Sequence, residues 1–105
     1  MTYSKKDYKL IKFEKSTRKH KKYAAVLEHK ITKRQVKVHF GDQRYQQWQD
    51  NTGLGLYSHL NHGDKKRRAN YRARHKKDNL KDYTAGYFSY YFLWGDKPDK
   101  NYLNK

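Results

Sequence analysis

The sequence predicts a small α+β domain with a three-stranded antiparallel sheet, one basic helix and an aromatic-rich C-terminal segment. Three observations favour this class. Short apolar runs alternate with basic residues over the first 40 residues, an aspartate then precedes a run of Lys, Arg and Ala, and an almost continuous aromatic run follows. A chain of 105 residues suffices for one domain. We assign that domain to residues 1–95 and expect 96–105 to be a polar tail.

The three strands are predicted from residues 8–15 (YKLIKFEK), 22–30 (KYAAVLEHK) and 34–40 (RQVKVHF). The last run alternates cleanly, with apolar residues at even positions and basic ones between them, which is typical of a half-buried strand. We therefore expect a meander with one apolar face and one basic face. The basic face is either a solvated sheet surface or an anion-binding surface.

The middle of the chain predicts one short and one long helix. The run DQRYQQWQ (42–49) is compatible with a short helix, which Gly53 and Gly55 then break. Residues 64–77 (DKKRRANYRARHKK) are the stronger candidate, because Asp64 suits an N-cap and Ala and Arg favour helices. This helix lacks an apolar face, so an acidic partner or a packed aromatic layer should offset its like charges.

The segment 83–95 (YTAGYFSYYFLWG) is the most apolar of the chain. We interpret it as the segment that closes the core over the sheet and helix; the alternative is a surface for stacking or docking. The predicted core consists of Val26, Leu27, Val36, Val38, Phe40, Tyr57, Leu60, Phe88, Leu93 and Trp94.

The composition points to an anionic partner. The net charge is +16, and Lys and Arg are concentrated in residues 1–40 and 61–78. Such a single-sign charge attracts polyanions, nucleic acid first, with acidic protein surfaces or lipid headgroups as competitors. The absence of Cys excludes disulfides and thiolate zinc sites. No apolar run is long enough for a membrane span, and residues 1–10 lack the apolar core of a signal peptide.

The predicted polyanion-binding residues all lie in the long helix predicted at 64–77. Arg can hold a phosphate through two donors, and Lys adds a point charge. The first N–H groups of the helix could take one more anion. The alternative interpretation is a nuclear localisation signal or a merely solvated face. The predicted binding residues are Lys65, Lys66, Arg67, Arg68, Arg72, Arg74, Lys76 and Lys77.

Two chemical alternatives involve the histidines. His59, His62, Asp64 and His75 could in principle bind zinc. A nuclease would use His62, Asp64 and His75 together with Arg72. The sequence has no clustered carboxylates and no recognisable histidine motif to support that activity. We therefore predict a protein that is not an enzyme and has no cofactor or metal. In this interpretation His59, His62 and Asp64 shape the loop and cap the helix.

The run TGLGLYSHLNHGDKKRRANYRARH, followed by AGYFSYYFLW, resembles a family of small, basic, mostly uncharacterised proteins of nucleocytoplasmic large DNA viruses, including algal and amoebal giant viruses. The resemblance covers roughly residues 22–95. The chain departs from the family pattern near Tyr90, where a Trp is common, and near Asn61, where an Asp is common. The matching pieces are Leu56-Tyr57-Ser58-His59-Leu60, His62-Gly63-Asp64, Arg67-Arg68, Tyr71-Arg72-Ala73-Arg74-His75, Phe88-Ser89 and Leu93-Trp94.

The resemblance implies a context and assigns no activity to any residue. It implies a viral protein in the virion, and in the host nucleus or cytoplasmic viral factory during infection. The leading hypothesis is sequence-independent DNA binding or genome organisation. The alternative is a minor capsid or core-shell structural protein that bridges acidic surfaces of other virion proteins, with self-assembly as a further possibility. A metal-dependent nuclease is the distant third.

Overall fold

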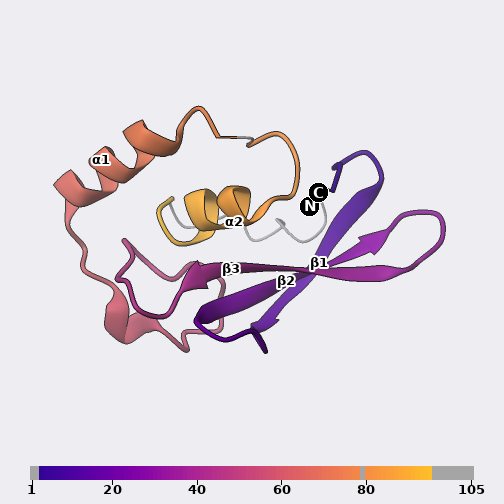
Figure 1. The fold of residues 1–105 in the computed structure, drawn as a ribbon, viewed down its shortest axis with the longest axis horizontal. Coiled ribbons are helices and arrows are strands. Elements are labelled where there is room, and N and C mark those ends of the chain that lie inside the picture. The colour runs from indigo at the N-terminus through magenta and orange to yellow at the C-terminus, as the bar shows by residue number, and fades with distance from the viewer. Residues whose placement is uncertain (1–2, 79, 96–105) are drawn as a thin grey trace.

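The computed structural model describes residues 3–78 and 80–95, and it confirms the α+β class. Three strands, β1 (Tyr8–Lys15), β2 (Lys21–His29) and β3 (Gln35–Asp42), form an antiparallel sheet in the order β1-β2-β3. A 3-10 turn, η1 (Ser58–Leu60), and two helices, α1 (Lys65–His75) and α2 (Ala85–Phe92), follow. Figure 1 shows α2 over one face of the sheet and α1 at one end of the molecule. The expected tail, 96–105, lies outside the described residues.

The register of β1 against β2 explains how β1 reaches the core. Leu10 pairs with Leu27 and Lys12 pairs with Val26, so Ile11 is an extra residue that forms a β-bulge. The bulge brings Leu10 and Phe13 to the same face although three positions separate them, and both are buried. Simple alternation along β1 would not have placed both side chains in the core.

Helix α2 closes the core through aromatic contacts. The Phe13 ring lies 4.6 Å from that of Phe92, and the Phe40 ring lies 5.5 Å from that of Phe88, measured between centroids. Thr84 caps the helix by accepting a hydrogen bond from the Tyr87 N–H. The prediction that 83–95 fills the core is thus confirmed. Its helical conformation was not predicted, because a continuous aromatic run shows no helical period.

Five of the ten predicted core residues are buried in the core, and three more, Val36, Tyr57 and Trp94, are partly buried against it. The other two are exceptions. Val26 is buried, but it lies on the sheet face opposite α2, in register with Lys12 and Lys37. Leu60 lies outside the core cluster. Further core residues that the sequence did not single out are Leu10, Phe13, Tyr23, Ala25, Tyr83 and Phe92.

The face opposite α2 is less basic than expected. Lys37 Nζ forms a 2.8 Å ion pair with Glu14, and Lys9 lies 3.7 Å from Glu28. The hydrogen bond from Lys37 holds the pKa of Glu14 below its ordinary value. Because carboxylates are interleaved with the lysines, this face suits solvent better than a polyanion.

The segment between β3 and η1 is irregular, so the short helix expected at 42–49 is wrong. Two neighbouring residues of β2 hold this segment instead. Lys22 Nζ donates to the Tyr45 carbonyl, 2.8 Å away, and to Gln47 Oε1. The Tyr23 hydroxyl donates to Asp50 and accepts from the Leu56 N–H at 3.0 Å. These tertiary bonds outweigh the weak local tendency toward a helix.

Candidate polyanion-binding surface

Helix α1 begins where the sequence predicts. Asp64 Oδ1 accepts hydrogen bonds from the N–H groups of Lys66 and Arg67 at 3.0 and 3.1 Å. His62 Nδ1 in turn accepts from the Asp64 N–H at 2.8 Å. The helix N-terminus is therefore occupied by its own cap, and the two N–H groups bound by Asp64 are not available for the extra anion expected there.

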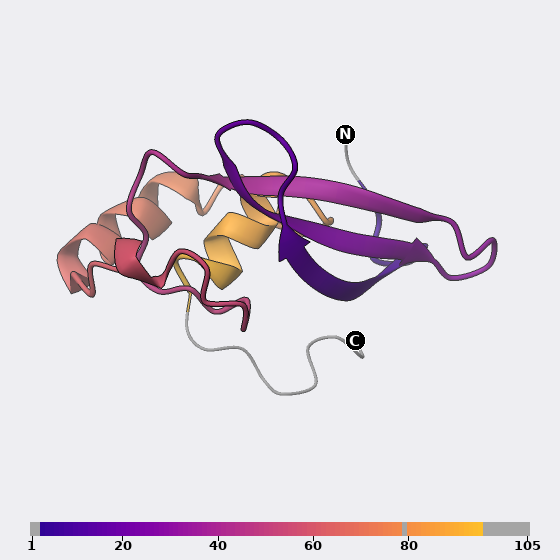
Figure 2. The same ribbon diagram turned by 90° about the horizontal axis from the view of Figure 1, so that it is seen from below.

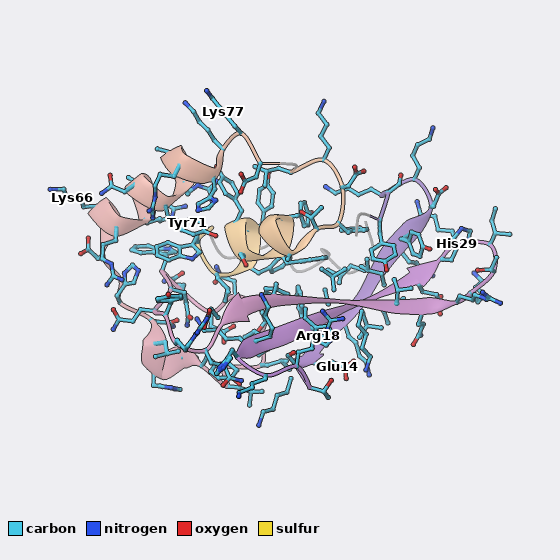
Figure 3. All side chains as sticks on the ribbon, in the orientation of Figure 1. Glu14, Arg18, His29, Lys66, Tyr71 and Lys77 are labelled. Carbon is cyan, nitrogen blue, oxygen red and sulfur yellow. The ribbon has the colours of Figure 1, made fainter. Side chains whose placement is uncertain are left out.

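One side of α1 is attached to the body by an aromatic stack. The Tyr71 ring lies parallel to Trp94, with 4.1 Å between centroids, and the His75 ring lies 4.3 Å from the Tyr71 ring, tilted by 34°. The His62 ring lies 5.2 Å from Trp94. Burial raises the pKa of Tyr71 to about 12. This is the aromatic layer that a helix without an aliphatic face requires, and Figure 3 shows Tyr71 pointing toward the body.

Two of the predicted binding residues lie on the same inner side. Arg72 Nη1 donates to the carbonyls of Tyr90 and Trp94 at 3.1 and 3.2 Å, and Arg68 Nε donates to the Trp94 carbonyl at 3.2 Å. The Arg72 guanidinium also lies 3.9 Å from the Tyr90 ring centroid. Both cations thus meet the carbonyl end of α2, where the helix dipole favours positive charge.

The remaining six cations lie away from this inner side, on the rest of α1 or just after it, and all six side chains are exposed. Arg67 bonds to Gln46 at 2.7 Å. The side chains of the other five make no hydrogen bond or ion pair with the residues the structure describes. Figure 3 shows Lys66 and Lys77 pointing away from the body. The five are Lys65, Lys66, Arg74, Lys76 and Lys77. We call these five and Arg67 the outer cations.

A cleft of about 1050 Å³ is lined by residues of α1, of the sheet end and of α2. Arg67 and Arg74 line it from the helix, and Lys21 and Asp42 line it from the strands. Gly41 lets β3 pass close to α2: its φ is +76°, and a Cβ there would lie 2.9 Å from Leu93 Cδ1. The cleft carries both signs of charge, whereas the four outer cations that do not line it, Lys65, Lys66, Lys76 and Lys77, are all lysines.

Lys22 and Gln47 form a buried polar centre beside the cleft, which the sequence did not reveal. Both side chains are almost inaccessible to solvent. Gln47 Nε2 donates to the Tyr57 carbonyl at 2.8 Å and to Asn61 Oδ1 at 2.7 Å. Burial lowers the pKa of Lys22 to about 8. A Lys among many lysines gives no sequence signal of burial, so only the fold could identify it.

The histidines do not assemble a metal site within residues 3–78 and 80–95, where no three His, Asp or Glu side chains come together as ligands. His75 pairs with Asp78 at 2.8 Å, and His62 supports the helix cap. His59 is exposed in η1, and its side chain makes no hydrogen bond to this part of the chain. Of the three residues expected to shape the loop, His62 and Asp64 do so directly.

The packing of His62 gives a pH prediction. Its Nδ1 accepts a hydrogen bond, and its Nε2 is buried with no partner among the described residues. Burial, and then the charge of Arg67, lowers the pKa of His62 below its ordinary 6.5, while Asp64 opposes the shift. Folding therefore favours the neutral ring. The stabilisation is complete above pH 6.5 and is lost as the pH falls from 6.5 toward the folded pKa.

We expect the free energy of unfolding to fall across that range, as measured by urea denaturation at a series of pH values. His62→Asn is the matched control, because its Oδ1 can still accept from the Asp64 N–H. The stability difference between wild type and His62→Asn should shrink as the pH drops. A difference that is constant with pH would show that His62 does not titrate in this way.

Comparison with known proteins adds one partial match. The model of a family described as "Family of unknown function (DUF5754)" matches residues 11–51. This range covers most of the sheet and the start of the irregular segment, and it ends before α1. No curated protein and no solved structure matches the chain.

Neither α-helix of the described residues is long and apolar enough to cross a membrane. Helix α1 has 11 residues and is strongly basic, and α2 has 8 residues.

Proposed function

We propose that this protein binds DNA without sequence preference, through the outer cations of α1. The observation that carries the proposal is the contrast between the two sides of that helix. Its inner side is fixed by Tyr71, Arg68 and Arg72, while the side chains of five outer cations make no hydrogen bond or ion pair with the described residues. Holding unneutralised like charges on a fixed helix is unfavourable unless an anion compensates.

The length of α1 suits contact with several phosphates. Its 11 residues span about 16 Å at the α-helical rise. Duplex DNA carries about one negative charge per 1.7 Å of axis, so long Lys and Arg side chains along this length can each reach a phosphate. Contacts of this kind position a protein on the duplex but do not read its sequence. Binding should therefore be strongly dependent on salt.

The test removes outer cations without touching the inner side. In the α1 variant, Lys66, Arg74 and Lys77 are changed to Gln. If each contacts a phosphate, the slope of log K against log salt should fall by about two to three, and affinity should fall with it. The measurement is a titration of labelled duplex by fluorescence anisotropy at several salt concentrations, with two unrelated duplex sequences.

The matched control changes Lys12, Lys15 and Lys19 to Gln, three exposed cations on β1 and the turn after it. It removes the same net charge, so a non-specific field effect would weaken binding equally in both variants. We expect the slope to fall clearly more in the α1 variant. Equal slopes would remove α1 from the contact, and a strong preference for one duplex would contradict sequence-independent binding.

A second candidate is a minor capsid or core-shell protein. The observation that favours it is the cleft, whose walls carry Arg67 and Arg74 as well as Asp42 and Asp78, a mixture that suits a protein surface better than a polyanion. Both candidate functions are compatible with the viral context that the sequence resemblance implies. Cross-linking in infected cells and particles separates them: DNA joined to α1 supports the first candidate, and protein joined to the cleft supports the second.

A further inference from the structure

The turn between β2 and β3 is held in a fixed shape by His29. Its Nδ1 accepts hydrogen bonds from the N–H groups of Ile31 and Thr32, both at 3.2 Å. The backbone closes the turn through Lys33 N–H to His29 O at 3.0 Å and His29 N–H to Arg34 O at 2.8 Å. The His29 ring packs edge-on against Tyr8, with 5.1 Å between centroids. The side chains at the tip are thus presented by an ordered backbone.

That turn exposes an apolar side chain among cations. Ile31 is 84% exposed, the highest value among the large hydrophobic residues described. Exposure of Ile is unfavourable, and no core contact offsets it. Cations surround it, and one of them, Lys30, binds the backbone carbonyl of Lys5 at 2.9 Å. The cations of the turn and of the adjoining segment are Lys5, Lys6, Lys30, Lys33 and Arg34.

Few carboxylates neutralise this end of the molecule. Glu28 is engaged by Lys9 at 3.7 Å and by Gln35 at 3.4 Å. Asp7 is exposed nearby, where its backbone carbonyl accepts from the Lys30 N–H at 2.8 Å. The remaining excess of cations makes the turn complementary to an anionic surface.

The turn and α1 lie at opposite ends of the molecule. Figures 1 and 2, viewed from two directions, both place α1 at one end of the long axis and the β2–β3 turn at the other. The molecule extends 42 Å along that axis. Because the Debye length is about 8 Å at physiological salt, the two cationic ends act independently on their surroundings. The sheet between them carries the paired Glu14 and Glu28, which weakens any continuous basic path.

We propose that the β2–β3 turn is a second DNA-contacting surface, and that one chain thereby bridges two DNA segments. The proposal rests on DNA binding by α1 and adds an architectural role to it. Lys30, Lys33 and Arg34 contact phosphates, while Ile31 packs into a groove of the second duplex. Apolar residues of this kind serve as wedges in proteins that bind the minor groove. Two contacts at opposite ends of one folded chain hold two duplexes together.

The test measures capture of one duplex by another. A duplex on beads is saturated with protein, and a labelled duplex of unrelated sequence is added. Wild type should retain the label. The turn variant combines Ile31→Ser, Lys33→Asn and Arg34→Gln; Asn suits the positive φ of 63° at Lys33, and the bonds of His29 are kept. It should bind the bead duplex within about twofold of wild type, a difference of about 0.4 kcal/mol, yet lose most of the captured label.

The outcomes distinguish a failure of DNA binding by α1 from a failure of bridging by the β2–β3 turn. If wild type binds no DNA at physiological salt, DNA binding itself fails. If wild type binds but captures nothing, or if the turn variant captures as much as wild type, bridging by the turn is overturned and α1 binding stands. The control with Lys12, Lys15 and Lys19 changed to Gln should capture normally. If the turn variant instead loses affinity only for anionic lipid vesicles, the surface faces a membrane and the proposal is wrong.

Discussion

Phe88→Ala should lower the free energy of unfolding by about 3–5 kcal/mol. Phe88 is completely inaccessible to solvent and stacks on Tyr83 at 5.5 Å, with further ring contacts to Phe13 at 5.9 Å and Phe92 at 6.1 Å. Removing the ring deletes the centre of the contact between α2 and the sheet. The cavity cannot collapse easily, because the surrounding rings come from three separate segments.

The loss would be large for this chain. Hydrophobic residues make up only 34% of it, and small domains have a total free energy of unfolding of about 5–15 kcal/mol. Urea denaturation followed by far-UV circular dichroism measures the effect. Tyr91→Ala is the matched control on the same helix, since Tyr91 is 39% exposed. If the two substitutions cost the same, α2 does not cover the sheet as described.

Arg72→Met should lower the free energy of unfolding by about 2 kcal/mol while leaving the salt dependence of DNA binding unchanged. Methionine keeps the unbranched stem but removes the donors to the Tyr90 and Trp94 carbonyls and the cation over the Tyr90 ring. Because Arg72 faces α2, its charge should not count among the phosphate contacts, although the sequence groups it with them.

Arg74→Met, on the same helix two residues later, is the reciprocal control. Its side chain is exposed and has no partner among the described residues. We expect little change in stability and a decrease of about one in the salt slope. Urea denaturation and anisotropy titrations on both variants give the comparison. If Arg72→Met lowered the slope as much as Arg74→Met, Arg72 would be a phosphate contact as well as a packing residue.

The sheet could be predicted because its signals are local. Alternation in β3 marks a half-buried strand, and Asp64 marks the start of α1. The conformation of residues 43–62 could not be predicted, because it is determined by bonds from Lys22 and Tyr23, which lie more than 20 residues earlier. Helix α2 was missed as a helix because its aromatic residues form a nearly continuous run without a helical period.

The sequence was sufficient to predict the helix that carries the candidate site. It was not sufficient to predict which side chains of that helix are exposed. The sequence shows that Arg68 and Arg72 share a helical face, but it does not show whether that face meets the protein or its partner. The decision depends on Trp94, which lies more than 20 residues away from both and supplies the stacking ring and the acceptor carbonyl. Arg and Lys residues that pack against the protein cannot be told from those that face solvent by residue type alone.

The position of α2 in the chain has a consequence for biosynthesis. The meander is complete at Asp42, but Phe88, Phe92 and their neighbours, which cover much of its apolar face, come more than 40 residues later. During translation the strands therefore leave the ribosome long before the helix that covers them, and the sheet face stays open to other nascent chains in that interval. The lysines interleaved along these strands oppose aggregation in that interval, because nascent chains of like charge repel one another.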